Sequence, residues 1–165
     1  MKTGSFSGRR WQLVAYPAAG GLCWSLTFVT HGTTGQGSAL ACGPVVGFPS
    51  KPRGPKMGIT FLASGGDDTY PAWIAGPVVP TATTVRLRIG TNTITTRTFA
   101  APASLGNIRF YVLEQPSGRP ARSRLGQRPH SPLTWLAGYD SRGAIVACLE
   151  PRTARDGISP PSACH

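Results

Sequence analysis

The chain contains few acidic residues and no long apolar run, and each absence limits what the protein can be. Asp and Glu number only 6 among its 165 residues. No stretch approaches the ~20 apolar residues of a membrane-spanning helix. The first ten residues contain no hydrophobic segment, so they do not form a complete secretory signal. No long amphipathic helical period is present either, which argues against a helical fold.

Motifs for metals, nucleotides and catalysis are also absent. The four cysteines include no CxxC pair and the three histidines are scattered, so zinc-ligand spacing is missing. There is no phosphate loop and no dinucleotide fingerprint. The sequence therefore predicts no metal and no cofactor.

The residues that are candidates for catalysis are better explained as loop. Ser38 lacks the flanking order of a nucleophile elbow, and His31 stands among Thr and Gly. Asp67 and Asp68 are the only paired carboxylates, but adjacent residues of an extended chain point in opposite directions, so they cannot simply share a substrate bond. We predict that the protein is not an enzyme.

Short apolar segments between frequent chain breakers are what the sequence does contain. Gly (21) and Pro (16) are abundant, yet 40% of the residues are hydrophobic, which excludes wholesale disorder. The clearest pattern spans residues 85–99, where Val85, Leu87 and Ile89 alternate with arginines before a turn and a Thr-rich return. This pattern predicts an antiparallel hairpin and, with its neighbours, an all-β protein.

The expected organisation is one domain with two irregular ends. Residues 1–9 are predicted to be a disordered lead and residues 150–165 a Pro-rich tail. Residues 10–149 are predicted to form an Ig-like antiparallel β-sandwich of about 7–9 strands in two packed sheets, with a small closed β-barrel as the alternative. The segment 116–132 carries four arginines without an apolar period and is predicted to be a basic loop insert outside the core. Trp11, Trp24, Trp73 and Trp135 lie in apolar strands and are predicted to be core residues for the most part.

The cysteine count favours disulfides and an oxidising compartment. Cys23 and Cys42 bracket a strand and the loop that leaves it, so we predict that they are bonded; two buried free thiols are the alternative. Cys148 and Cys164 are the candidates for a second bridge. This compartment conflicts with the lack of a complete secretory signal in the chain. We therefore expect an extracytoplasmic part of a longer envelope or secreted protein, with a signal or membrane anchor upstream.

The charge balance is strongly basic. The net charge is +11, and Arg86, Arg88 and Arg97 are expected to share the outward face of the hairpin. Such a face can attract a polyanion without reading its sequence. The other residues of this possible polyanion face are those of the insert, Arg119, Arg122, Arg124 and Arg128. The alternative is that these arginines are only a solvated surface.

Several short motifs resemble a group of bacterial domains. The motifs are Trp11 to Tyr16, Gly21-Leu22-Cys23, Cys42-Gly43, Gly76-Pro77-Val78, Val85 to Arg88, Ala101-Pro102 with Leu105-Gly106, Arg109-Phe110-Tyr111 and Tyr139 to Gly143. Together they resemble exported or membrane-anchored Ig-like β-sandwich domains of high-GC Gram-positive bacteria, which have no assigned activity. The resemblance implies a domain outside the cytoplasm and carries over no catalytic residue.

These observations lead to two functional expectations. The first is a non-catalytic extracytoplasmic module with an interaction, structural or sensory role in a cell-envelope protein, whose partner the sequence does not name. The second is nonspecific binding of nucleic acid or acidic glycan through the arginine-rich face.

Overall fold

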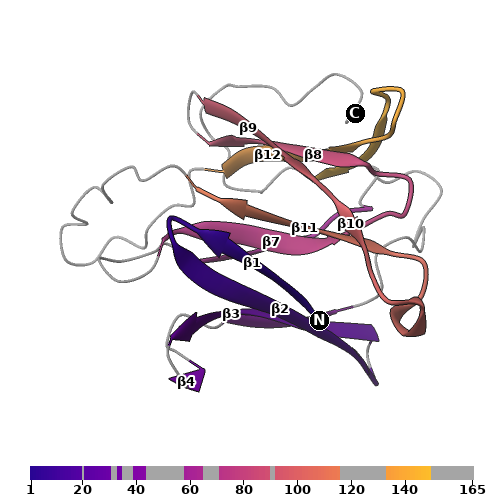
Figure 1. The fold of residues 1–165 in the computed structure, drawn as a ribbon. Helices are drawn as coiled ribbons and strands as arrows, with labels where there is room; N and C mark the ends of the chain where they lie inside the picture. Colours follow the sequence, from indigo (N-terminus) through magenta and orange to yellow (C-terminus); the bar gives the residue numbers. More distant parts are fainter. Residues whose placement is uncertain are drawn as a thin grey trace, which may run out of the picture.

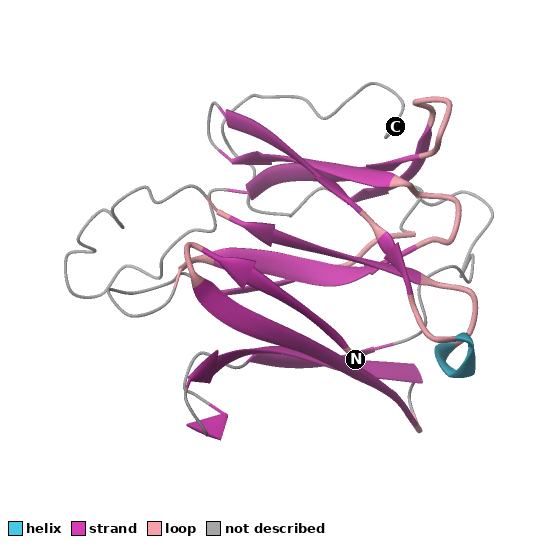
Figure 2. Ribbon diagram, viewed as in Figure 1, coloured by secondary structure: helices cyan, strands magenta, loops and turns pink. Residues whose placement is uncertain are grey.

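The computed structural model describes eight stretches of the chain, residues 1–19, 21–30, 33–34, 39–43, 58–64, 71–89, 92–115 and 133–149. They form an all-β structure of three antiparallel sheets, none of which closes into a barrel. The sheets are stacked in layers, and a single turn of 3-10 helix is the one helical element described (Figure 1 and Figure 2).

Each sheet pairs strands that are mostly close in sequence. The first contains β1 (Lys2–Phe6), β2 (Arg9–Ala18), β3 (Gly21–Thr30), β4 (Thr33–Thr34) and β5 (Ala39–Gly43), with β4 and β5 both pairing with β3. The second has the order β10 (Phe99–Ala100), β11 (Arg109–Glu114), β7 (Trp73–Val78) and β6 (Leu62–Ser64). The third has the order β13 (Ile145–Leu149), β12 (Leu133–Tyr139), β8 (Thr84–Ile89) and β9 (Asn92–Arg97). The helical turn η1 (Ala103–Leu105) lies between β10 and β11.

The second sheet is the middle layer and is covered on both faces (Figure 1). Trp73 and Phe110 belong to the apolar cluster shared with the first sheet, whereas their neighbours Ile74 and Tyr111 belong to the cluster shared with the third. Successive side chains of a strand point to opposite faces, so β7 and β11 supply both cores at once. The expectation of two packed sheets is therefore wrong, because a third layer covers the far face of the middle sheet. The alternative of a closed barrel is also wrong, because none of the sheets formed by the described residues closes. An Ig-like topology is not established by this arrangement.

The lead that the sequence predicted to be disordered is a strand. In the structure β1 pairs with β2 through a two-residue turn at Ser7 and Gly8, both with positive φ. Backbones of this kind match the twist of the flanking strands of a hairpin. Phe6 is buried against Trp11, with ring centroids 5.5 Å apart, and this contact ties the segment to the first core.

The Gly76-Pro77 pair lies inside a sheet, although proline in a strand is usually confined to an edge or a bulge. The strand β7 is flanked by β11 on one side and β6 on the other. Pro77 has no N–H, and the partner ladder is interrupted beside it: β6 begins at Leu62, and an isolated bridge joins Ile59 to Val78. Gly76 permits the close approach there, because an added Cβ would lie 2.1 Å from the carbonyl oxygen of Thr60.

Thr98 marks the point where the chain passes from the third sheet to the second. It lies between β9 and β10 and is 8% exposed. Its hydroxyl donates to the carbonyl of Ala82 (2.7 Å) and accepts from Arg109 Nε (2.6 Å), while its carbonyl accepts from Arg109 Nη2 (3.1 Å). These hydrogen bonds give partners to the buried polar groups at the corner where the second and third sheets meet.

The remaining organisational predictions lie outside the described residues. They are the basic insert at 116–132 and the tail at 150–165.

Candidate functional site

The outer face of the third sheet gathers the three arginines that the sequence singled out in the hairpin. In β8, Val85 and Leu87 are fully buried in the inner core while Arg86 is exposed. The register pairs Thr84 with Arg97 and places Arg86 and Arg88 opposite Thr95 and Thr93. Directly paired residues of antiparallel strands share a face, so Arg86, Arg88 and Arg97 all lie on the side away from the core.

The same face continues onto β12, where it is aromatic. Arg88 pairs with Trp135 and Thr84 with Tyr139. The guanidinium of Arg86 lies 4.6 Å from the ring centroid of Tyr139, within the range of a cation–π contact. Arg86 is therefore held in place by an aromatic ring, with the edge of its guanidinium still suited to donating hydrogen bonds.

The aromatic half of this face was missed from the sequence. Trp135 is buried, as expected, and so is Tyr139, but both belong to a third apolar cluster with Ala137 and Cys148, separate from the two inner cores. The signal that would have found them is the period-2 alternation of β12 combined with its pairing to β8. The other three tryptophans lie in the core between the first and second sheets, as predicted.

Other residues singled out from the sequence lie outside the described part of the chain. They are the arginines of the insert, Arg119, Arg122, Arg124 and Arg128, together with His31, Ser38, Asp67 and Asp68. Among the residues that are described, no group of three or more His, Cys, Asp or Glu side chains is placed to hold a metal ion.

The predicted disulfide between Cys23 and Cys42 is confirmed, but Cys42 lies in a strand and not in a loop. The two residues are direct partners across β3 and β5, with Cα atoms 4.0 Å apart. Cys23 is buried and Cys42 is exposed. Cys148 is also disulfide-bonded, and its predicted partner, Cys164, lies outside the described residues.

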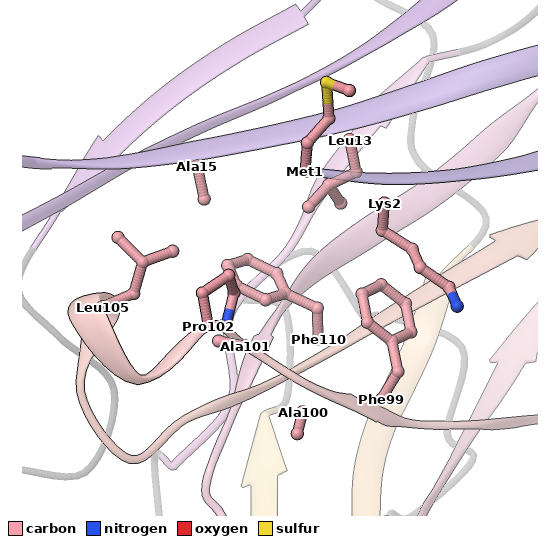
Figure 3. A pocket seen from close by; sticks show the side chains of 10 residues that line it. All are labelled: Met1, Lys2, Leu13, Ala15, Phe99, Ala100, Ala101, Pro102, Leu105 and Phe110. Atoms are coloured by element: carbon pink, nitrogen blue, oxygen red, sulfur yellow. The ribbon is translucent and has the colours of Figure 1, made fainter.

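A separate cavity of about 310 Å³ opens between the first sheet and the segment that follows β10 (Figure 3). Of the ten described residues that line it, nine are apolar and the tenth is Lys2. Leu13 of β2 and Phe110 of β11 are buried lining residues, and Leu105 of η1 lies at one end, as Figure 3 shows. Nothing in the sequence predicted this cavity, because its walls come from strands far apart in the chain.

The comparisons with known proteins identify no relative. No protein-family model, curated protein or solved structure matches this chain. The resemblance to exported Ig-like domains thus gains no support from a family match. In the part of the chain that is described, no helix has the length and hydrophobicity to cross a bilayer.

Proposed function

We propose that this chain is a non-catalytic interaction module that acts outside the cytoplasm as part of a cell-envelope protein. The observation that carries the proposal is the cystine chemistry: Cys23 is bonded to Cys42 and Cys148 is bonded as well. Disulfides persist in oxidising compartments and are rare in reducing ones. The resemblance of the strand motifs to exported Ig-like domains points in the same direction.

The compartment is tested by the redox state of the protein in its own cells. Cells are fractionated after thiols have been blocked, and the mass of the protein is measured before and after reduction. We expect the protein in the envelope or secreted fraction, with Cys23 and Cys42 protected from alkylation until reductant is added. Recovery from the cytoplasm with both thiols alkylated would overturn the proposal.

A second candidate function is binding of a polyanion through the arginine face of the third sheet. The observation that favours it is the register, which puts Arg86, Arg88 and Arg97 on one side of the β8–β9 hairpin. The net charge of +11 would draw a nucleic acid or acidic glycan to such a face. These three arginines are spread over two strands and would contact phosphates rather than base edges, so we expect weak sequence preference.

The test is a titration with heparin and with duplex DNA at two salt concentrations. We expect the triple variant Arg86→Ala, Arg88→Ala, Arg97→Ala to bind more weakly than the parent. Its log–log salt slope should be shallower by about one unit for each phosphate that the variant no longer neutralises. The matched control is a triple alanine variant at Lys2, Arg9 and Arg10, which are exposed in the first sheet and carry the same charge. Equal binding by both triple variants would show that Arg86, Arg88 and Arg97 contribute only their charge and form no binding face.

A further inference from the structure

The cavity beside β10 has the layout of a site for an amphiphile. Its base is apolar and buried, since Leu13 is 3% exposed and Phe110 is 1% exposed. Ala15 and Leu105 lie toward one end of the view in Figure 3, and Lys2 and Phe99 lie toward the other. The cavity therefore has an apolar end and an end that carries a cation.

Among the described residues that line the cavity, Lys2 alone has a charged side chain. It is exposed, and its ammonium group lies 5.6 Å from the centroid of the Phe99 ring. An aliphatic stem that follows an apolar wall while its charged head stays in water is the usual arrangement of a lysine at such a boundary. A ligand that fills the cavity would place any group at this end within reach of a positive charge.

We propose that this cavity binds a free medium-chain fatty acid, with the acyl chain along Leu13 and Phe110 and the carboxylate at Lys2. Apolar walls with a few polar groups that fix orientation are characteristic of small-molecule sites. A volume of about 310 Å³ lies at the small end of the range of such sites, which excludes a large ligand. The positive charge at one end selects an anionic head over a neutral or cationic one.

Binding is measured by isothermal titration calorimetry with three ten-carbon probes, each kept below the concentration at which it forms micelles. The probes are decanoate, decanol and decyltrimethylammonium, which share the chain and differ in the charge of the head. We expect decanoate to bind most tightly, decanol about twofold to fivefold more weakly, as for an exposed ion pair, and the cation weakest.

Two sets of variants locate the site. Ala15→Leu and Ala101→Leu each fill part of the cavity and should abolish decanoate binding. Val14→Leu adds volume to the adjacent residue of β2 and is the matched control, because Val14 lies on the opposite face of the strand. Lys2→Gln should remove the preference for decanoate over decanol, whereas Arg10→Gln removes the same charge from the outer face of the sheet and should leave the preference intact.

The thermal melting of every variant is recorded to show that it folds. If one of the two filling variants does not fold, the binding measured for the other one tests the proposal. The proposal is overturned if the parent shows no binding of decanoate. It is also overturned if a folded filling variant binds as well as the parent, or if the cationic probe binds as tightly as decanoate. Because the arginine face is intact in all these variants, the result is independent of polyanion binding.

Discussion

Gly76 occupies a position that no larger residue fits. An added Cβ would meet the carbonyl oxygen of Thr60 at 2.1 Å, and that oxygen belongs to backbone that cannot swing aside. We expect Gly76→Ala to lower the free energy of unfolding by about 1–3 kcal/mol, the range for an overpacked core. Urea denaturation measures the change.

Gly43 supplies the control for this substitution. It also lies in a strand, but no heavy atom of the described residues is within 4 Å of a Cβ built there. Gly43→Ala should change stability by no more than about 0.5 kcal/mol. Equal effects at the two positions would show that the close approach of Thr60 does not restrict Gly76.

Tyr111 makes the free energy of unfolding depend on pH in the alkaline range. Its ring is fully buried and its hydroxyl donates to the carbonyl of Thr60 at 2.9 Å. Burial disfavours the phenolate and raises the pKa of Tyr111 well above its ordinary value of 10.0. The folded state therefore keeps a proton that the unfolded chain releases above pH 10, so stability falls as pH rises beyond that point.

The phenylalanine variant isolates this contribution. Tyr111→Phe should lose about 1 kcal/mol near pH 7, because the hydrogen bond to Thr60 is gone. Between pH 10 and pH 11 it should lose less additional stability than the parent, by up to about 1.4 kcal/mol for the single proton. Urea midpoints across this range provide the measurement, and parallel curves would contradict the argument.

At the scale of elements, the passage from β9 to β10 depends on the hydroxyl of Thr98. Thr98→Val keeps the shape but leaves the carbonyl of Ala82 and the Nε of Arg109 without this partner. We expect a loss of about 1–3 kcal/mol, the usual consequence of an unsatisfied buried group. Thr98→Ser retains the hydroxyl and should lose less, and thermal melting compares the two. A smaller loss for valine than for serine would mean that packing of the methyl group outweighs the hydrogen bonds.

Strands were readily predicted from the sequence, whereas their partners were not. The alternation of Val85 and Leu87 with arginines predicts one buried face and one solvent-exposed face, and β8 has both. The segment at β1 was missed because Phe6 is its single large apolar residue, and its contact with Trp11 comes from the next strand. Local pattern carries no information about such pairings.

The number of layers was missed for a related reason. The continuous apolar runs of β7 and β11 indicate strands buried on both faces, but they do not predict that a separate sheet covers each face. The arginine side of the hairpin was predictable because it needs only the period of one strand. Its aromatic half and the cavity at Lys2 depend on tertiary register, which the sequence leaves open.

At the scale of the whole molecule, the Cys23–Cys42 bond acts on the unfolded chain. The sequence separation is 19 residues, and closing a loop of that size stabilises the protein by about 3 kcal/mol in the chain-entropy model. We expect the double variant Cys23→Ser, Cys42→Ser to lose stability of this order in urea denaturation. Treatment with a reductant would open the bond of Cys148 as well, so the parent should lose more stability on reduction than the double variant does.

A control keeps this prediction specific. Ser25→Ala changes another residue of β3 on the same outer face, opposite Leu40 of β5, without touching the bond. Its stability should stay within about 0.5 kcal/mol of the parent. A double serine variant as stable as this control would show that β5 holds to β3 without the covalent link.

The order of the strands in the sequence also determines when each sheet can form during synthesis. The strands of the first sheet are complete once residue 43 has been made, but the strands that cover its aromatic face continue to residue 114. At ordinary rates of synthesis that interval lasts roughly 4–14 s. During it, Trp11, Trp24 and Phe28 have no second sheet to pack against. A chain built in this order leaves these aromatic side chains without their partners from the middle sheet until β7 and β11 have been made.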